Sequence, residues 1–413
     1  MANRNIDRRT SLKMLAGAAL GMAAPAIVRA APTEIPIGIL VALTGPNGAW
    51  GQTAWEGAQL VCDRINQQGG VKGMGGAKLK PIVADTESKP QVASSQAEKL
   101  IRMGVVTMLG TNQSAATNIA TQICERRSVP FVIPSDIDPL TTARGFKYTF
   151  RIYPLMNNFS HDILAYAKRL SEASGKPAKT LAILSENTAP GKASVDAIRA
   201  VLPRFNYELV DISMYDSPQT QNFSPYIAKY KAAGVDVLLG HNRPSDGVAI
   251  VRTMKELNYV PKFTGGLLGG HSSREFLDTL GPDADGIFGS GGYSATINLP
   301  VIGQVAQEFQ KRFNKSIDST AAGMISAISV VWDALERTKS LEGPAMRDAF
   351  AATDMAMGSR YYMIANGAKF DAVGENSKAE AIVFMIKDKV AHAVSPESFA
   401  SIKGVYPKAP WRV

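Results

Sequence analysis

Residues 35–66 read IPIGILVALTGPNGAWGQTAWEGAQLVCDRIN. An apolar run at 35–43 ends in a turn of Gly, Pro and Asn at 44–48, and an amphipathic segment follows at once. Apolar side chains of that segment share one helical face: Ala54, Ala58, Val61 and Ile65. Strand, glycine-rich loop and helix in this order form a parallel βαβ unit, whose loop lines a ligand crevice in doubly wound α/β domains. We therefore expect Trp50, which lies in this loop, to stack on or pack against a ligand.

Further strand-like runs recur at the spacing of an α/β protein, with helical patterns between them. These runs lie at 79–84, 105–109, 131–134, 180–184, 207–213 and 235–240. Two Rossmann-like halves fit this order, the first to about residue 152 and the second from there to about residue 286. Two long helical patterns then precede extended runs at 381–386 and 390–394. The sequence thus predicts an α/β fold with two Rossmann-like lobes.

The length and composition fit a globular protein of two domains. The chain has 413 residues, 45% of them hydrophobic, and a formal net charge of +9. Without residues 1–30 there remain 40 basic and 35 acidic residues, a net charge of +5. No basic run interleaved with aromatic residues occurs, so we expect no nucleic-acid partner.

The two cysteines, Cys62 and Cys124, are too few for a disulfide scaffold. They fall in the helical patterns that follow the first and the third strand-like runs. Such helices commonly cover opposite faces of a doubly wound sheet, whereas the Cα atoms of a disulfide lie within about 7 Å of each other. We therefore expect two free, buried thiols rather than a bridge.

The N-terminal residues resemble an export signal. The run DRRTSLK at 7–13 is similar to a twin-arginine motif, with Ser11 where Phe is commoner, and an apolar stretch follows at 14–28. Residues 28–30, VRA, fit a cleavage site, which makes residues 1–30 the predicted signal peptide. A membrane anchor is the alternative, but the apolar core is short and rich in Ala and Gly. We expect export to the periplasm by the twin-arginine route and, since no later apolar run of spanning length occurs, a soluble mature protein.

Three motifs within 37–73 carry a family resemblance: IGILVALTGPNGAWG, WEGAQL and DRINQQGGVKG. They resemble the type I periplasmic solute-binding proteins of the branched-chain amino-acid ABC importers, and the resemblance runs from about Ile35 to the C-terminus. It implies two lobes joined by a three-crossover hinge, which closes on a ligand. By this analogy, lobe one is 34–152 plus 289–360 and lobe two is 153–288 plus 361–413. The implied partners are a small-molecule ligand and an inner-membrane ABC permease, and we expect a monomer.

Nothing in the sequence predicts an enzyme. The motifs G-x-S-x-G and H-E-x-x-H do not occur, and neither cysteine has a neighbouring histidine. The four histidines lack metal-ligand spacing: His161, His241, His271 and His392. We expect no catalytic residue, no metal and no cofactor.

The segment LGTNQSAAT at 109–117 ends a strand-like run and starts a helical one. Free backbone N–H groups at that point, together with the hydroxyl of Ser114, suit a carboxylate at the helix N-terminus. In the resembled family the matching loop holds the carboxylate of the ligand, and Ser114 aligns with its key hydroxyl. We place the neighbouring Asn112 and Gln113 in the same site. A plain helix N-cap is the alternative.

A second loop, PSDIDP at 134–139, follows the next strand-like run. We place Ser135, Asp136 and Ile137 in the site. The family usually shows small residues and a Thr here, so Asp136 and Ile137 depart from its pattern. The Asp136 carboxylate either accepts hydrogen bonds from an amine or hydroxyl of the ligand or caps the following turn, and both interpretations stay open.

Three further strand ends supply the expected residues of lobe two. Pro190 stands where many relatives carry an aromatic residue. His241 and Asn242 follow a strand-like run, and Arg243 beside them either pairs with a carboxylate or forms a salt bridge at the rim. Leu267 stands about where amino-acid binders of this family hold the α-ammonium group with an acidic residue. Burying an unpaired ammonium costs several kcal/mol, so the amino-acid ligand does not carry over with the family.

These patterns predict the periplasmic solute-binding component of an ABC importer, with a small carboxylate of apolar or aromatic body as its ligand. A branched-chain or aromatic amino acid is the first alternative, with Asp136 supplying the missing acid. An amide- or urea-type ligand, read by Asn112, Gln113 and Asn242, is the second. A ligand-sensing module of a receptor uses the same fold but is usually tethered to a spanning helix.

Overall fold

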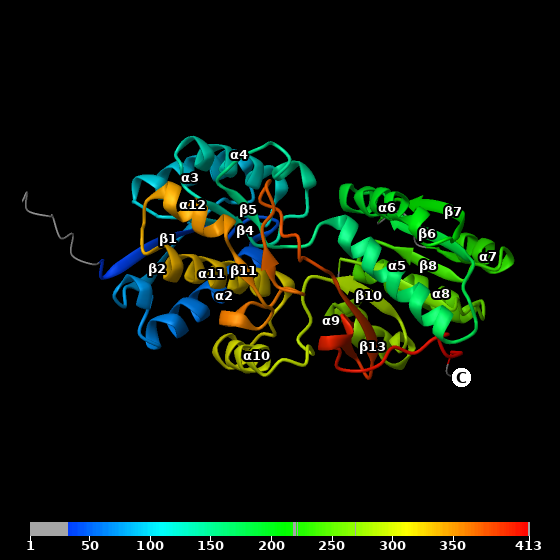
Figure 1. Cartoon of the computed structure of the whole chain (residues 1–413). Coiled ribbons are helices and arrows are strands. Elements are labelled where there is room, and N and C mark those ends of the chain that lie inside the picture. The colour runs from blue at the N-terminus through cyan, green and yellow to red at the C-terminus, as the bar shows by residue number, and fades with distance from the viewer. Residues whose placement is uncertain (1–31, 218–219, 221, 269, 412–413) are drawn as a thin grey trace, which may run out of the picture.

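A computed structural model describes residues 32–217, 220, 222–268 and 270–411 of the chain. The predicted signal peptide at 1–30 lies outside the described residues. The described chain forms two α/β lobes that lie side by side, each a sheet covered by helices (Figure 1). The predicted architecture of two lobes with parallel sheets is therefore confirmed. Among these residues, no helix is both long enough and apolar enough to cross a membrane.

The first lobe is built on a parallel sheet whose described strands follow the order β2-β1-β3-β4-β5. Its strands are β1 (Glu34–Val41), β2 (Lys78–Asp85), β3 (Met108–Gly110), β4 (Phe131–Ile133) and β5 (Thr149–Arg151). Its helices are α2 (Gly48–Gln67), α3 (Pro90–Arg102), α4 (Ser114–Arg126), α10 (Pro300–Phe313), α11 (Ser319–Thr338) and α12 (Gly343–Ala351). The side chains of Ile35, Ile37 and Ile39 on β1 are fully buried. Helices on both faces of the sheet explain the nearly continuous apolar run of this strand.

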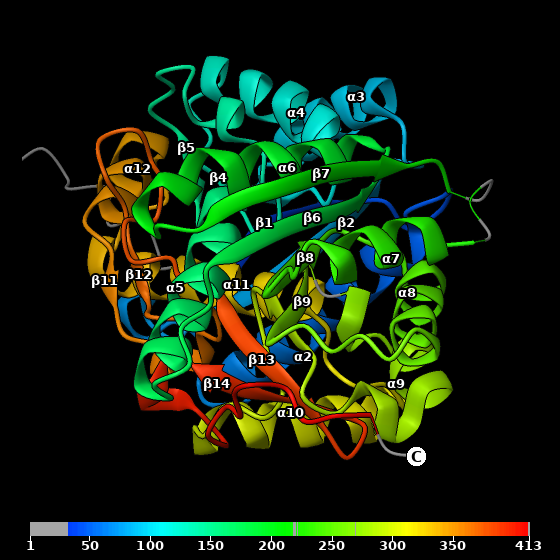
Figure 2. The same cartoon turned by 90° about the vertical axis from the view of Figure 1, so that its right-hand side faces the viewer.

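The second lobe is built on a larger sheet, with the described strands in the order β14-β13-β10-β9-β8-β6-β7 (Figure 2). Its strands are β6 (Thr180–Glu186), β7 (Glu208–Tyr215), β8 (Val237–Gly240), β9 (Phe263–Leu267), β10 (Phe288–Gly291), β13 (Ile382–Lys387) and β14 (Val390–Ser395). Its helices are α5 (Met156–Ala173), α6 (Ala189–Val201), α7 (Ser224–Ala232), α8 (Pro244–Glu256) and α9 (Arg274–Leu280). Strand β13 runs antiparallel to its neighbours β10 and β14, and the other pairs are parallel.

Short elements complete the described chain. A small antiparallel sheet joins β11 (Asp354–Met355) to β12 (Ala368–Lys369). Single 3₁₀ turns lie at Lys72–Met74, Pro139–Thr141, Leu202–Arg204, Gly270–Ser272, Gly281–Ala284, Ser359–Tyr361 and Glu397–Phe399. Each strand-like run predicted from the sequence overlaps an observed strand, including the late hairpin of β13 and β14.

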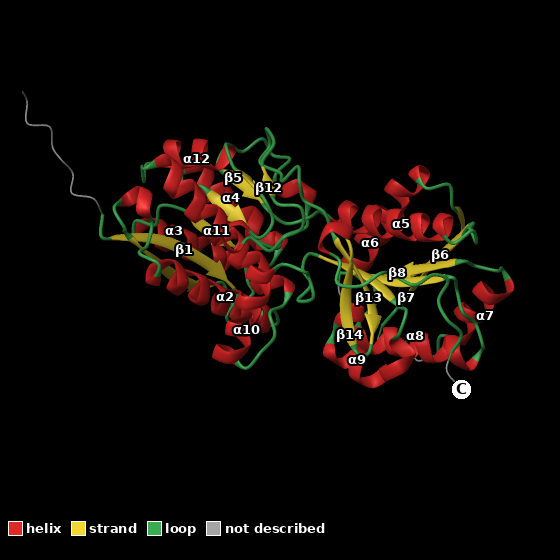
Figure 3. Ribbon diagram, turned by 60° about the horizontal axis from the view of Figure 1, so that its bottom comes forward, coloured by secondary structure: helices red, strands yellow, loops and turns green. Residues whose placement is uncertain are grey.

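The chain passes between the two sheets three times: after β5, after β10 and before β13. Strand β5 ends beside the first crossing, and β1, β3 and β4 run parallel to it. Strand β10 ends beside the second crossing, and β9, β8 and β6 run parallel to it. The carboxyl ends of both parallel sheets therefore lie on the side of the crossings. Figure 3 shows β1 running toward the second lobe, so the loops after these strands face the gap between the lobes.

The contacts around the crossings refine the expected division into lobes. Strand β10 pairs with β9, so the second sheet continues past the expected change of lobe at residue 289. The ring of Phe370 lies 5.1 Å from that of Phe150 in the first lobe, so the segment after β12 returns to the second lobe later than expected. A division near residues 292 and 378 fits these contacts and remains our interpretation.

Helix α2 begins directly against the end of β1, and the glycine at position 51 permits this approach. A Cβ atom at Gly51 would lie 1.8 Å from the carbonyl oxygen of Ala42, so a larger residue would push the helix away from the strand. The predicted apolar face of α2 is buried, largely against α11: Ala54, Ala58, Val61 and Ile65. Full burial of a Val or Ile side chain such as Val61 or Ile65 contributes roughly 1.5–3 kcal/mol, so this face holds the helix in place.

Both cysteines are free and buried, as predicted. Cys62 belongs to the main apolar core, whereas Cys124 packs in a separate cluster with its Sγ 3.9 Å from the sulfur of Met108. Burial raises the pKa of both thiols above the ordinary range. The two side chains are therefore core residues without thiolate character at neutral pH.

Candidate ligand-binding site

The predicted site residues lie at the carboxyl ends of strands or in the first turns of the helices that follow, on both sides of the gap between the lobes. In the first lobe these loops follow β1, β3 and β4, and in the second they follow β6, β8 and β9. Trp50 lies in the first turn of α2, and 56% of its surface is exposed. A large apolar ring that is exposed at the end of a strand-end loop is free to pack on a ligand.

Ser114 and Asp136 are in direct contact in the first lobe. The Ser114 hydroxyl donates to Asp136 Oδ1 at 2.5 Å, and the backbone N–H of Asp138 donates to the same oxygen at 3.0 Å. The Thr141 hydroxyl donates to Asp136 Oδ2 at 2.8 Å. Asp136 is only 3% exposed. Both carboxylate oxygens therefore have donors within the protein, and one of those donors is the hydroxyl expected to meet the ligand.

Arg151 lies beneath this loop and was not predicted from the sequence to take part in the site. Its guanidinium is fully buried and donates from Nη1 to the carbonyl of Asp136 at 3.1 Å and from Nη2 to the carbonyl of Asp138 at 2.5 Å. Its Nε lies 3.4 Å from Glu375 Oε1, an ion pair with the segment that leads to the third crossing. Burial raises the pKa of Glu375, an effect that Arg151 partly offsets. A charged residue within the strand-like run TFRIY at 149–153 could have indicated a buried arginine with polar partners.

The N-terminus of α4 adjoins polar atoms that have no partner in the described structure. Gln113 is the N-cap residue, and its side chain makes no capping hydrogen bond. The amide oxygen and nitrogen of Asn112, Oε1 of Gln113 and Oγ of Ser135 are buried without a hydrogen-bond partner. Buried polar atoms are normally satisfied, so this group of atoms is a candidate contact for a ligand. Ile137 is half-buried and packs against the main core, which gives the loop an apolar edge.

In the second lobe, Glu186 forms the centre of a polar cluster. Its carboxylate is almost fully buried, with Oε2 2.9 Å from Nε of Arg243 and Oε1 3.7 Å from Nε2 of His241. The Thr188 hydroxyl donates to Oε1 at 2.8 Å. The Arg243 contact is an ion pair rather than an aligned hydrogen bond, since Oε2 has no hydrogen-bond partner by geometry. Glu186, like Arg151, was not identified from the sequence.

The other expected residues of the second lobe have mixed surroundings. The Leu267 side chain is fully buried, and its carbonyl oxygen lies 3.3 Å from Nδ1 of His241. Burial lowers the pKa of His241, and the contacts with Leu267 and Glu186 partly oppose this effect. The Asn242 amide is buried and donates to the Leu184 carbonyl at 2.9 Å, so it links strand ends. Pro190 is exposed in the first turn of α6.

The structure therefore assembles two groups of residues, one on each lobe. Asn112, Gln113, Ser114, Ser135 and Asp136 lie together in the first lobe, and His241 contacts Leu267 in the second. Within the described residues, the hydrogen bonds of these side chains stay inside their own lobe. The two groups therefore lie at facing strand ends of the two lobes, and no hydrogen bond of these described side chains joins them.

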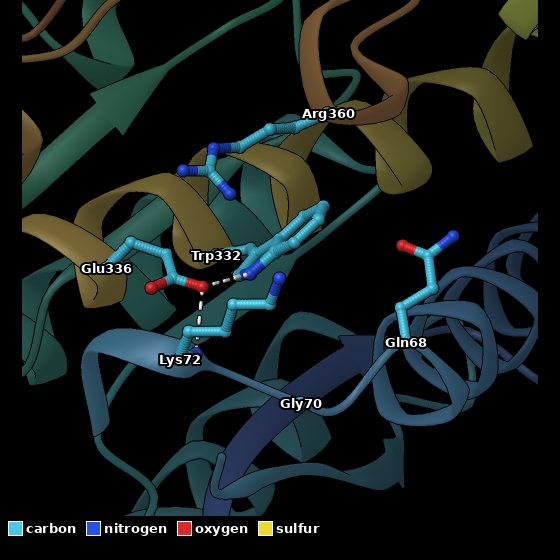
Figure 4. A pocket seen from close by; sticks show the side chains of 6 residues that line it. All are labelled: Gln68, Gly70, Lys72, Trp332, Glu336 and Arg360. Atoms are coloured by element: carbon cyan, nitrogen blue, oxygen red, sulfur yellow. Dashed lines mark hydrogen bonds between the residues drawn. The ribbon is translucent and has the colours of Figure 1, made fainter. Parts of the chain in front are cut away.

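A cavity of about 360 Å³ lies elsewhere, where the C-terminal end of α2 meets α11 (Figure 4). Its lining residues are Gln68, Gly70, Lys72, Trp332, Glu336 and Arg360. The Glu336 carboxylate accepts hydrogen bonds from Nε1 of Trp332 at 2.9 Å and from the backbone N–H of Lys72 at 3.0 Å. The Arg360 guanidinium lies 4.5 Å from the centre of the Trp332 ring. These contacts join the end of α2 to α11, and none of the predicted site residues lines the cavity. Among the described residues, no group of His, Cys, Asp and Glu side chains is arranged to hold a metal ion.

Two α/β lobes whose strand-end loops face each other across three crossings define a bilobal ligand-binding protein. Residues 34–383 match the family model for periplasmic binding proteins, and the chain belongs to this family. Its members are solute-binding components of transport systems.

Relatives and solved structures agree with this assignment. The Leu/Ile/Val-binding protein homolog 7 of Brucella suis is 25% identical over 380 residues, which cover 90% of this chain and 93% of the relative. The branched-chain amino-acid transporter substrate-binding protein LivJ of Streptococcus pneumoniae, in complex with isoleucine, has a TM-score of 0.69 at 21% identity, covering 87% of this chain and 98% of LivJ. A solute-binding protein of an ABC transporter from Rhodopseudomonas palustris, in complex with 3,4-dihydroxybenzoic acid, has a TM-score of 0.69 at 18% identity, covering 91% of this chain and 99% of that protein.

Proposed function

We propose that the chain is the solute-binding component of an ABC importer and that it captures a small carboxylate with an apolar or aromatic body. The N-terminus of α4, with the unpartnered atoms of Asn112 and Ser135 beside it, carries this proposal. The first N–H groups of a helix attract an anion, and a bound carboxylate would satisfy donors that otherwise stay unpaired. Trp50 would cover the apolar body of the ligand.

The state of the acidic side chains favours a ligand without an ammonium group. Asp136 accepts three hydrogen bonds from the protein, and Glu186 is paired with Arg243 and bonded to Thr188. Glu186 already has a cationic partner in Arg243, and both oxygens of Asp136 already accept hydrogen bonds from the protein. An α-ammonium group would have to compete with these donors for Asp136, and without a counter-ion its burial would cost several kcal/mol.

The ligands named for the similar proteins support the same class. Isoleucine and 3,4-dihydroxybenzoic acid are both small carboxylates with an apolar or aromatic body. They differ in the ammonium group, and in this chain both acids near the gap already have protein partners. A ligand that touches both lobes binds the closed form more tightly and so drives closure.

The remaining parts of the proposal follow from the family and the leader. Residues 1–30 would direct the protein to the periplasm by the twin-arginine route, and the mature protein would act as a monomer. The closed form would then dock on an inner-membrane ABC permease. Cell fractionation tests the twin-arginine route. The wild-type protein should be found in the periplasm, and a variant with both Arg8 and Arg9 changed to Lys should not.

Matched ligand pairs test the ligand class. Mass spectrometry of molecules released from freshly purified protein comes first, followed by thermal shifts with 4-methylpentanoate against leucine and 3-phenylpropanoate against phenylalanine. Each pair differs only in the α-ammonium group. A ligand at a hundred times its Kd stabilises the protein by about 2.7 kcal/mol, which is readily measured. We expect the acids to shift the transition and the amino acids to leave it unchanged.

Two variants localise the binding. Asn112→Ala and Ser135→Ala each remove unpartnered polar atoms beside α4 and should weaken the binding of an acid. Ser95→Ala, on the exposed side of α3, serves as the matched control. Stronger shifts by leucine or phenylalanine would establish the amino-acid alternative and require Asp136 to hold the ammonium. Benzamide binding as tightly as benzoate would favour an amide ligand, whose affinity should not change with salt. No shift by any of these compounds would contradict the proposed function.

A further inference from the structure

The second lobe carries a polar cluster that the proposed capture of a carboxylate by the first lobe does not use. It consists of Glu186, His241 and Arg243, which we call the Arg243 cluster. Glu186 ends β6, and the other two residues follow β8, so the cluster lies at the strand ends that face the gap. The anion site proposed at α4 lies at the corresponding strand ends of the other lobe. A ligand held between the lobes would meet the Arg243 cluster with its far end.

The guanidinium of Arg243 is held in place but keeps free donors. The Arg243 side chain is 53% exposed, whereas that of Glu186 is only 5% exposed. Their 2.9 Å contact involves Nε alone, and no acceptor in the described structure binds the terminal nitrogens. The buried carboxylate of Glu186 therefore restrains the half-exposed guanidinium of Arg243, whose two terminal nitrogens remain available as donors. This arrangement reduces the side-chain entropy that Arg243 would lose on binding a ligand.

His241 adds an acceptor to the same cluster. Its Nδ1 lies 3.3 Å from the carbonyl oxygen of Leu267, and a carbonyl only accepts, so the proton of the neutral ring belongs on Nδ1. Nε2 then carries a lone pair, and its 3.7 Å distance from Glu186 Oε1 is too long for a hydrogen bond. Burial lowers the pKa of His241, which keeps the ring neutral at neutral pH.

The charges of the cluster select between the groups that fit it. Glu186 and Arg243 cancel, and the His241 ring is neutral, so the cluster has donors and an acceptor but no net charge. A second carboxylate would gain from Arg243 and lose to Glu186 and to the lone pair of His241. A hydroxyl accepts from Arg243 and donates to His241 Nε2, so it uses both groups at once.

We propose that the Arg243 cluster recognises a hydroxyl group at the far end of the ligand, which makes a hydroxylated aromatic carboxylate the preferred solute. This inference rests on the proposed function, since it assumes that α4 holds the carboxylate. It adds a specificity determinant on lobe two: Arg243 as the donor and His241 as the acceptor, with Glu186 as a positioning residue.

Calorimetric titration with three probes tests the inference: benzoate, 4-hydroxybenzoate and benzene-1,4-dicarboxylate. The wild type should bind 4-hydroxybenzoate at least tenfold more tightly than benzoate, and the dicarboxylate no more tightly than benzoate. Arg243→Met and His241→Phe should each remove most of the tenfold preference, which is measured as the ratio of the 4-hydroxybenzoate and benzoate affinities of the same variant. Arg252→Met, an exposed arginine on the same helix α8, is the matched control and should change none of the three affinities.

Two further variants separate recognition from general effects of charge. Arg243→Lys keeps the charge but not the paired donors, so it should lose the preference for the hydroxyl. Glu186→Gln should raise affinity for the dicarboxylate, because it leaves Arg243 uncompensated. Tightest binding of the dicarboxylate by the wild type, or an equal loss of all three ligands in Arg243→Met, would overturn the inference. Binding of benzoate without any gain from the hydroxyl, or binding of the acids 4-methylpentanoate and 3-phenylpropanoate but of none of the three probes, would refute this inference alone. Failure of all five compounds to bind would refute the proposed function with it.

Discussion

Replacing Arg151 by methionine should destabilise the first lobe by several kcal/mol, although the side chain lies beneath the site and not in it. The substitution leaves the carbonyl oxygens of Asp136 and Asp138 without their donor and Glu375 without its counter-ion. A buried polar group deprived of its partner costs about 1–3 kcal/mol. Breaking a buried ion pair costs roughly 3–5 kcal/mol, and the two effects overlap because one guanidinium supplies both. We expect a loss of about 3–5 kcal/mol in the free energy of unfolding at pH 7.

The pH dependence of this loss follows from Glu375. Burial raises the pKa of its carboxyl group, and removal of Arg151 raises that pKa further. An acid with a raised pKa in the folded state destabilises the fold above that pKa, and the penalty disappears as the pH falls and the group takes up a proton. The deficit of Arg151→Met should therefore be largest at neutral pH and should shrink toward pH 4.5.

Urea unfolding followed by circular dichroism at several pH values provides the measurement. The exposed Arg102→Met in the same lobe is the control and should cost less than about 0.5 kcal/mol. The double variant Arg151→Met/Glu375→Met replaces the buried pair by apolar side chains and should be more stable than Arg151→Met alone. A loss below about 1 kcal/mol in the single variant, or a larger loss in the double variant, would refute the reasoning.

Three other results are expected. Burial lowers the pKa of the His271 ring to about 4, so protonation of this ring opposes folding. The free energy of unfolding should therefore fall by roughly 3 kcal/mol as the pH drops from 6.5 to 4. In urea unfolding, His271→Asn should show a weaker pH dependence than the wild type, and an unchanged pH dependence would contradict this. Glu336→Ala removes the acceptor of two backbone N–H groups and of Trp332, so it should cost about 1–3 kcal/mol while ligand affinity, measured by calorimetry, stays the same. Cys62 and Cys124 should not react with a thiol reagent in the folded protein and should both react in denaturant, because burial raises the pKa of each thiol; fast labelling without denaturant would count against this.

The architecture could be predicted from the sequence because it depends on local periodicity. Buried strands such as β1 appear as short apolar runs, and the face of α2 appears as apolar residues at helical spacing. The end of an apolar run also marks the end of a strand, so the loop that contains Ser114 could be assigned to the carboxyl edge of the sheet from the sequence alone.

The partners of the site side chains could not be predicted, because they come from distant parts of the chain. Glu375 lies 224 positions after Arg151 and reaches it only because the third crossing returns beside β5. The amide of Asn242, a predicted site residue, donates to the carbonyl of Leu184, a contact that depends on the pairing of β6 with β8. Sequence patterns indicate which residues reach the edge of a sheet, whereas the fold determines what each side chain bonds to there.

The three crossings also bear on the thermodynamics of ligand capture. Two lobes joined by one flexible tether would sample many relative orientations, and a ligand binding to both would have to restrict that freedom. Three connections that run close together leave little beyond a bending motion, so the second lobe is present near the first at a high effective concentration. Most of the orientational entropy is thus lost when the chain folds and not when the solute arrives. A small molecule that makes only a few contacts with each lobe can therefore still bind tightly.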